Sequence, residues 1–200
     1  MTSYGFRLFD DAEELDFVGP WEVITASSTL RVRDGADPDD GDDRRDRQPG
    51  EVRQGHGGPP HHSIDDHPPL DVIVVPGGQG TRAEIDNETL LAWLGNTGPL
   101  ATWVTSVCTG SLLLVGAGLA TNKRVATHWS FEDTLAERGD CTVVRDARWV
   151  RDGNVVTSQG VSAGIDMALW LIGQIHNPAH ARAVQRYIAY EPAPPYQADV

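Results

Sequence analysis

The sequence predicts an α/β fold with a mostly parallel central sheet, and three observations support this class. Trp103 to Val107 is apolar and rich in β-branched residues, as in a buried parallel strand, and it passes without a polar turn into the helix-forming run Ser111 to Val115. Asp71 to Val75 is a second apolar run, and it ends in Pro76-Gly77-Gly78. The chain of 200 residues is long enough for one such domain with a sizeable core.

The composition restricts the partners and the compartment that we expect. The formal net charge of −13 would repel the phosphates of a nucleic acid. The N-terminus lacks the charged-then-apolar pattern of a signal peptide, and no apolar run approaches the length that spans a bilayer. Two cysteines are typical of a reducing compartment rather than of a disulfide-rich secreted protein. We therefore expect a cytoplasmic protein with no nucleic-acid or membrane partner.

The chain begins with a predicted buried strand, Tyr4 to Phe9, which an acidic turn at 10–14 and a helix follow. The apolar face that predicts this helix starts with Leu15, Val18 and Val23. Asp16 lies among these apolar residues, and two interpretations of it remain open. Either it is an N-cap of the helix, or it is a carboxylic acid held near the end of the strand 103–107. In the second case it keeps its proton because burial disfavours the charged form.

The segment from Asp34 to His67 has the composition of an insertion without regular structure. Acids alternate with arginines in its first part, and its second part is rich in Gly, Pro and His. No strand-like or helix-like apolar period runs through it, so we predict a long solvated loop. Its histidines lie at irregular spacings, and we therefore predict no bound metal. These histidines are His56, His61, His62 and His67. The prediction is one domain over residues 1–200 with this insertion at 34–67.

The predicted strand Asp71 to Val75 ends in two glycines, Gly77 and Gly78. Glycines at the carboxyl end of a parallel strand allow backbone N–H groups to approach a ligand closely. The alternative is that both are ordinary turn residues. We predict that they bind substrate, with the N–H groups of Gly78 and Thr109 forming a site for an oxyanion or another negative charge.

Cys108, Thr109 and Gly110 connect the predicted strand 103–107 directly to the next helix. A strand that turns this sharply into a helix exposes the side chain at the turn, here that of Cys108. The nucleophile elbow of hydrolases has this geometry and carries Ser at this position. At a helix N-terminus, unpaired N–H groups and the helix dipole favour a thiolate. We therefore predict an exposed and activated thiol at Cys108. The alternative is a buried cysteine that serves as a small apolar residue.

Apolar periodicity and turn signals predict the remaining elements. A helix over Glu84 to Leu94 would face inward with Ile85, Leu90, Leu91 and Leu94. After the helix at 111–115 we expect a strand at 124–127, a helix that ends at Glu137, a strand at 141–144 in which Cys141 belongs to the core, hairpin strands at 149–151 and 154–158, and helices at 162–175 and 178–190. His128 follows the strand at 124–127. It is either a base, an orienting or a substrate-binding group near Cys108, or a structural histidine, and both interpretations stay open.

The motifs S-V-C-T-G-S-L-L-L, A-T-H-W and V-V-P-G-G-Q-G resemble those of the ThiJ/PfpI superfamily of class I glutamine amidotransferase-like proteins. L-D-F-V-G-P-W-E-V, K-R-V-A-T-H-W, V-R-D-G-N and Y-E-P-A-P-P-Y are more narrowly similar to the bacterial isocyanide (isonitrile) hydratases. The match runs in order over most of the chain. This resemblance implies a flavodoxin-like three-layer sandwich with a reactive cysteine at an elbow, and a homodimer.

The resemblance also implies a cysteine-dependent hydratase, a lyase whose small-molecule substrate is an isocyanide. Cys108 matches the family nucleophile, which would attack the isocyanide carbon to give a thioimidate. Asp16 matches the acidic partner, which would protonate the carbon or position water, and Thr109 matches a threonine that hydrogen-bonds within the site. Hydrolysis of the thioimidate would then release an N-substituted formamide. Neither a metal nor an organic cofactor is needed.

Two departures from the family pattern affect these expectations. Residue 109 is Thr where the superfamily's proteases and amidases have His, which disfavours peptide hydrolysis. The segment 34–67 replaces a strand and a hairpin of the relatives, which affects a sheet edge or part of the homodimer surface. Two alternative functions stay open. One is a glyoxalase- or deglycase-like enzyme that acts on α-oxoaldehydes, and the other is a non-catalytic small-molecule sensor related to the AraC-type regulators.

Overall fold

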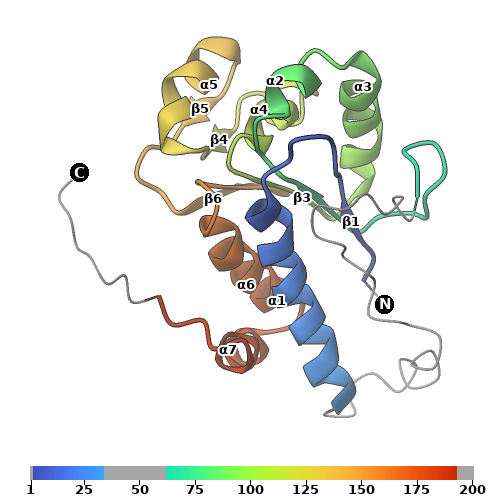
Figure 1. Cartoon of the computed structure of the whole chain (residues 1–200), viewed down its shortest axis with the longest axis vertical. Helices are drawn as coiled ribbons and strands as arrows, with labels where there is room; N and C mark the ends of the chain where they lie inside the picture. The colour runs from blue at the N-terminus through green and yellow to red at the C-terminus, as the bar shows by residue number, and fades with distance from the viewer. Residues whose placement is uncertain (1, 34–61, 193–200) are drawn as a thin grey trace.

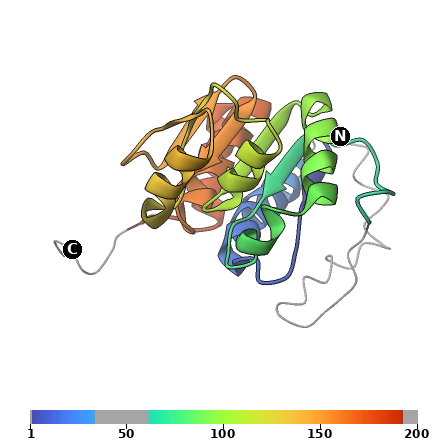
Figure 2. The same cartoon turned by 90° about the horizontal axis from the view of Figure 1, so that it is seen from above.

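The computed structural model describes residues 2–33 and 62–192 and shows a three-layer α/β sandwich (Figure 1). Within these residues, five strands form the central sheet in the order β1-β2-β3-β7-β6. Helices α1, α6 and α7 cover one face, and α2, α3, α4 and α5 lie on the other (Figures 1 and 2). The strands are β1 (Tyr4–Phe6), β2 (Val72–Val75), β3 (Trp103–Val107), β4 (Arg124–Val125), β5 (Thr142–Val143), β6 (Trp149–Asp152) and β7 (Val155–Ser158). The helices are α1 (Glu14–Arg33), α2 (Thr81–Glu84), α3 (Glu88–Thr97), η3 (Gly98–Leu100), α4 (Gly110–Gly116), η4 (Trp129–Phe131), α5 (Glu132–Arg138), α6 (Ala163–Ile175) and α7 (Pro178–Tyr187).

The sheet is mostly parallel, which confirms the fold class that we predict from the sequence. Strands β1, β2, β3 and β7 are parallel to one another, and only β6 pairs antiparallel, with β7. The predicted hairpin accounts for this edge, because Gly153 between β6 and β7 has a φ of +65° that favours glycine. The small strands β4 and β5 form a separate parallel pair. The carboxyl ends of β2, β3 and β7 are therefore neighbours at one edge.

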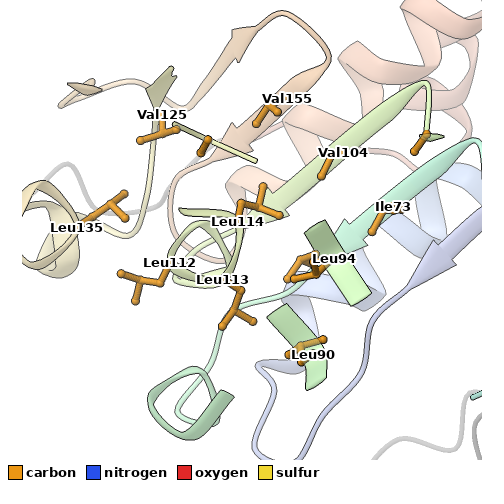
Figure 3. Packing of buried hydrophobic residues seen from close by; sticks show 13 residues of the cluster. Ile73, Leu90, Leu94, Val104, Leu112, Leu113, Leu114, Val125, Leu135 and Val155 are labelled. Carbon is orange, nitrogen blue, oxygen red and sulfur yellow. The ribbon is translucent and has the colours of Figure 1, made fainter. Parts of the chain in front are cut away.

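The two faces of the sheet bury different clusters because successive side chains of a strand point to opposite faces. On β2, Ile73 and Val75 belong to the cluster under α3 and α4 (Figure 3), whereas Val72 and Val74 pack with Leu171 of α6. The cluster in Figure 3 also contains fully buried leucines from three helices. These leucines are Leu90, Leu94, Leu113, Leu114 and Leu135. Burial of this kind is the main source of folding free energy.

Helix α1 differs from the sequence prediction in the face that it buries. Asp16, Gly19, Val23 and Leu30 are buried, whereas Leu15 is 37% exposed. The apolar periodicity places Leu15 inward, but the helix is turned so that the neighbouring carboxyl enters the protein instead. The rotation of α1 therefore brings Asp16 to the carboxyl end of β2, where its carboxyl accepts the Gly77 N–H.

The other differences concern boundaries. The single helix predicted for 84–94 is two helices, α2 and α3, because the Asn87 side chain accepts the Leu90 N–H and starts a new helix there. Most of the insertion predicted at 34–67 lies outside the described residues, including His56 and His61. His67 is described, and its ring accepts the Trp93 Nε1–H at 2.9 Å. Among the described residues, no helix is long and apolar enough to cross a membrane, and no three His, Cys, Asp or Glu side chains gather as a metal site would require.

Candidate active site

Cys108 lies in the turn between β3 and α4 and has a φ of +57°, in the left-handed region. This conformation is uncommon for a residue with a side chain and stores strain, as is typical of an elbow between a strand and a helix. The side chain is only 7% exposed and packs beside Val107 and Met167. The predicted sharp turn is therefore present, but the prediction of an exposed thiol is wrong.

Four hydrogen bonds hold the Cys108 backbone in this conformation. Its N–H points to the carbonyl oxygens of Ser158 and Gln159, at 3.2 Å and 3.1 Å, where β7 ends. Its carbonyl oxygen accepts the hydroxyls of Ser111 and Thr127, each at 3.1 Å. The strained turn is thus attached to α4, to β7 and to the segment after β4, so the surrounding structure rather than the local sequence fixes the direction of the thiol.

Asp16 reaches the same place from the first turn of α1, where it is fully buried. Its Oδ2 accepts the Gly77 N–H at 2.8 Å, and the Glu13 N–H donates to the Gly77 carbonyl oxygen at 3.0 Å. These reciprocal bonds attach the start of α1 to the carboxyl end of β2. The interpretation of Asp16 as an N-cap is therefore wrong, because the residue lies within α1 and its carboxyl accepts from Gly77.

The environment of the Asp16 carboxyl opposes its ionisation. Burial, reinforced by the charge of Glu13, raises its pKa to about 7, while hydrogen bonds from Gly77 and from the Cys108 thiol act in the opposite direction. The Oδ1 atom is buried and has no hydrogen-bond partner. A carboxyl in this state exchanges a proton near neutral pH, which is the property that general acid–base chemistry requires.

The Cys108 thiol is also held in its neutral form. Burial and the neighbouring Asp16 charge raise its pKa to about 11. The backbone N–H groups of Thr109 and Val161 and the Thr109 hydroxyl counteract this because they are directed at the sulfur and favour its anion. The N–H groups at the start of α4 therefore favour the thiolate as expected from the sequence, but burial and the Asp16 charge outweigh them in the pKa of this thiol. Asp16 is the carboxyl that lies beside this thiol, and a catalytic role for the pair stays a prediction.

Thr109 lies at the centre of a small hydroxyl network. Its Oγ1 accepts the Gly78 N–H at 3.1 Å and lies 3.1 Å from the Thr81 hydroxyl. The Gly77 and Gly78 N–H groups thus have acceptors within the protein, whereas we predict from the sequence that they face a ligand. Substrate binding by these two groups stays a prediction, and an incoming substrate would have to replace Asp16 and Thr109 as their acceptors.

Gly77 has no room for a side chain. A Cβ atom there would lie 2.6 Å from the Thr109 nitrogen, 2.7 Å from the Thr109 Oγ1 and 2.9 Å from the Asp16 Oδ2. The absence of a side chain at Gly77 is what lets β2, α1 and the elbow meet. This explains in steric terms why the glycine pair follows β2.

His128 borders the site, and its side-chain hydrogen bonds are to Ser130 rather than to Cys108 or Asp16. Its Nδ1 accepts the Ser130 N–H at 3.3 Å, which leaves the ring proton on Nε2. The Nε2 edge faces Gly160, because a Cβ built on Gly160 would lie 3.1 Å from that nitrogen. Gly160 precedes Val161, whose N–H is directed at the sulfur. His128 therefore caps η4, which is a structural role, and its role as a base, an orienting or a substrate-binding group stays a prediction.

The structure adds four residues that sequence reasoning missed, which are Thr81, Arg82, Thr127 and Val161. Arg82 Nη1 donates to the Gly78 carbonyl oxygen at 2.6 Å. Val161 has a φ of +45°, which is rare for a β-branched residue, and places its N–H toward Cys108. The hydroxyl of Thr127 supports the elbow and that of Thr81 supports Thr109. Thr127 lies beside His128 in the T-H-W motif, which is a signal that could have found it. No pattern distinguishes Val161, since its conformation depends on tertiary packing.

The fold and the site together define an α/β protein with a buried cysteine at a strand-to-helix elbow and a buried carboxyl beside it. The DJ-1/PfpI family model matches residues 5–174, and the chain belongs to this family. The isonitrile hydratase of Pseudomonas putida is 38% identical over 192 residues, which cover 96% of this chain and 80% of that protein. The match thus includes every residue of the site.

Solved structures and regulators show how widely the fold is used. A ThiJ/PfpI family protein from Pseudomonas syringae superposes with a TM-score of 0.79 at 26% identity, over 100% of this chain and 80% of the other. DJ-1 of Schizosaccharomyces pombe shares the fold with a TM-score of 0.69 at 20% identity, over 96% of this chain and 100% of that one. The transcriptional regulator CdhR of Pseudomonas aeruginosa is 33% identical over 54% of this chain but only 31% of its own length.

Proposed function

We propose that this protein hydrates isocyanides to N-substituted formamides, with Cys108 as nucleophile and Asp16 as proton carrier. The observation that carries the proposal is the contact between the thiol and a carboxyl whose pKa is about 7. Hydration of an isocyanide places both the nucleophile and a proton on the same carbon, so the reaction needs one group that attacks and one that delivers the proton. The similarity to the Pseudomonas putida isonitrile hydratase supports the same substrate class.

In the first step, ionised Asp16 accepts the thiol proton while the Cys108 sulfur forms a bond to the isocyanide carbon. The lone pair of that carbon then takes the proton back from Asp16, which gives an N-substituted thioimidate and restores the carboxylate. The N–H groups of Thr109 and Val161 stabilise the transient negative charge on sulfur. Because the thiol pKa lies near 11, the thiolate forms only as the substrate reacts.

In the second step, water adds to the carbon of the thioimidate and the carbon–sulfur bond breaks. Asp16 accepts one proton from the attacking water and delivers it to the imine nitrogen, and the second water proton passes to the departing sulfur to restore the thiol. The imine nitrogen ends as the N–H of the formamide. The balance is one isocyanide plus one water to one formamide, and neither metal nor organic cofactor takes part in it.

The burial of Cys108 suits this substrate class. With 7% of the residue exposed, only a slender group can reach the sulfur. The terminal carbon of an isocyanide ends a linear group without substituents, whereas an amide or peptide carbonyl carries substituents on both sides. The homodimer and the cytoplasmic location that we expect from the sequence belong to the proposal as well.

The decisive experiment measures formamide release from aryl and alkyl isocyanides by the wild type, by Cys108→Ala and by Cys141→Ala. Cys141 is the other free cysteine and lies outside the site, so its variant is the matched control. We expect Cys108→Ala to lose at least about 10³-fold in rate and Cys141→Ala to keep the wild-type rate. Equal activity of the wild type and Cys108→Ala would refute the proposed nucleophile.

A substrate panel separates this function from its alternatives. Turnover of methylglyoxal with no turnover of isocyanides would favour an α-oxoaldehyde enzyme. Saturable binding of small molecules without turnover would favour a sensor, for which the partial match to the regulator CdhR is the supporting observation. Formamide production that is faster than any α-oxoaldehyde turnover would support the proposal.

A further inference from the structure

Arg148 directly precedes β6 and holds the turn of residues 159–162, which connects β7 to α6. Its carbonyl oxygen accepts the Gln159 N–H at 2.9 Å. Its side chain reaches the start of α6, where Nε donates to Asp166 Oδ2 at 2.8 Å and Nη2 donates to the same oxygen. Nη2 also lies 3.4 Å from the Ser162 hydroxyl oxygen. One residue thus holds the turn at both of its ends.

The turn 159–162 contains a strained residue and an uncapped helix start. Val161 has a φ of +45°, which is rare for a residue with a branched side chain. Ser162 stands at the N-cap position of α6, but its hydroxyl accepts no N–H of that helix and lies beside the Arg148 guanidinium instead. A strained backbone persists only where the surrounding structure fixes it. The contacts of Arg148 supply such a constraint.

The same turn fixes the backbone of the cysteine. The Cys108 N–H is directed at the carbonyl oxygens of Ser158 and Gln159, at 3.2 Å and 3.1 Å. The next residue, Gly160, lies against the His128 ring, because a Cβ atom there would lie 2.4 Å from His128 Cδ2. Cys108 is strained itself, with a φ of +57°. A shift of the turn therefore moves the acceptors that keep Cys108 in this conformation.

The arginine at position 148 suits this task better than a lysine would. Its side chain is 49% exposed and that of Asp166 is 28% exposed, so the ion pair adds little to global stability. Asp166 lies in the first turn of α6, where the helix dipole also favours a carboxylate. A guanidinium presents several donors in a fixed plane, and here they reach both Asp166 and Ser162. The contribution of Arg148 is therefore local, at the start of α6.

We propose that Arg148 is a positioning residue for Cys108, because it fixes the turn 159–162 whose carbonyl oxygens face the Cys108 N–H. The hydrogen bonds of its side chain go to Asp166 and Ser162, so it acts on the thiol through the turn. Without the guanidinium, the start of α6 is released, the strained Cys108 backbone relaxes, and the thiol becomes more accessible and less well directed. The consequence for turnover rests on the proposed function, whereas the consequence for access to the thiol does not.

The test compares Arg148→Gln and Arg148→Lys in a Cys141→Ala background, so that Cys108 is the single thiol. The rate of Cys108 alkylation by iodoacetamide is measured at one pH without denaturant and without any isocyanide. We expect Arg148→Gln to speed alkylation about threefold to tenfold, because local opening exposes a buried thiol, and Arg148→Lys to restore most of the protection.

Arg145→Gln is the matched control. Arg145 is 54% exposed and forms ion pairs with Glu132, at 3.1 Å, and with Asp133, both in α5 and outside the turn 159–162. Its loss removes as many charged contacts as the loss of Arg148, so we expect its alkylation rate to equal that of the Cys141→Ala background. An alkylation rate of Arg148→Gln no higher than that of Arg145→Gln would overturn the inference.

Asp166→Asn reaches the same contact from the other side and serves if Arg148→Gln does not fold. We expect it to speed alkylation as Arg148→Gln does, and the double variant to add no further change, because both remove one interaction. Additive effects of the two substitutions would overturn the inference, because each residue would then act on the thiol independently.

The second measurement is kcat and KM for an isocyanide. Positioning of the nucleophile predicts that kcat of Arg148→Gln falls about tenfold with an unchanged KM. An effect confined to KM would overturn the inference, because it would make Arg148 a substrate contact. If alkylation changes as expected while neither the wild type nor any variant turns over isocyanides, the positioning role stands and the proposed function fails.

Discussion

The middle and the carboxyl end of strand β2 have opposite surroundings in this protein. The middle of β2 contributes Ile73 to a fully apolar cluster under α3 and α4 (Figure 3), whereas its carboxyl end meets the buried carboxyl of Asp16 and the hydroxyl of Thr109. The apolar cluster contains no group that opposes burial. The polar end combines an unpaired carboxyl oxygen with a strained backbone at Cys108. Burial of the apolar cluster therefore stabilises the fold, whereas the buried carboxyl and the strained backbone at the site destabilise it.

Replacing the Asp16 carboxyl by an amide tests whether the polar end of β2 serves proton transfer. In Asp16→Asn the amide oxygen can still accept the Gly77 N–H, so the contact to β2 is kept while proton transfer is lost. We expect kcat for isocyanide hydration to fall about 10²- to 10⁴-fold, the usual contribution of a general acid–base. Steady-state kinetics give the answer, and an unchanged kcat would reduce Asp16 to a structural residue.

Shortening a side chain in the apolar cluster tests whether this cluster contributes to stability rather than to catalysis. Leu113 of α4 is fully buried in this cluster, so Leu113→Ala removes contacts that the structure cannot replace. We expect the free energy of unfolding to fall by about 3 kcal/mol, with the rate per folded molecule close to that of the wild type. Urea unfolding and active-site titration measure the two quantities. A large loss of rate with little loss of stability would remove the distinction between the two regions.

The free energy of unfolding of the wild type should depend on pH through Asp16, because burial of an ionised carboxylate destabilises the fold. An asparagine at this position does not ionise, so Asp16→Asn lacks this dependence. Its pKa is about 7 in the fold against about 4 in the unfolded chain, so its contribution is complete below pH 4 and is lost as the pH rises through 7. At pH 8 the fold must bury a carboxylate, and we expect Asp16→Asn to be more stable than the wild type by up to about 4 kcal/mol, at about 1.4 kcal/mol for each pH unit between the two pKa values.

Urea unfolding measures the stability of the wild type and of Asp16→Asn at pH 8, and the same measurement at pH 4.5 is the control. We expect most of the stability gain of Asp16→Asn to disappear there, because the wild-type carboxyl is then protonated in the fold. A gain of equal size at both pH values would show that the carboxyl is not desolvated.

The smallest expected effect concerns the strained backbone. At a φ of +57°, Cys108→Gly should be more stable than Cys108→Ala by about 1 kcal/mol, because glycine adopts this conformation without strain. The control is Ala92→Gly in the exposed face of α3, where glycine should instead cost about 1 kcal/mol. Thermal unfolding compares the pairs, and a less stable Cys108→Gly would mean that the elbow stores no strain.

Prediction from the sequence succeeded where the signal is local. Strand β3 has the predicted bounds, Trp103–Val107, because a continuous apolar run that passes into helix formers leaves no other arrangement. The hairpin of β6 and β7 follows from Asp152-Gly153 for the same reason. Prediction failed for the orientation of α1, where Leu15 and Asp16 compete for the inward position. Only packing against α6 and the hydrogen bond from the Gly77 N–H select Asp16.

The candidate site divides in the same way. Its motif residues Asp16, Cys108 and Thr109 were found from the sequence, and the structure brings all three together. The supporting residues Arg82 and Val161 were not found, because a hydrogen bond to a carbonyl or a positive φ leaves no mark on the type of residue.

By itself, the sequence determined that the chain forms an α/β sandwich of the DJ-1/PfpI family and that a cysteine lies where a strand turns into a helix. Only the tertiary structure decided that burial raises the pKa of this thiol and raises the pKa of the neighbouring Asp16 carboxyl to about 7. The physical reason is that a pKa depends on lost hydration and on neighbouring charges, and both come from segments that meet only after folding.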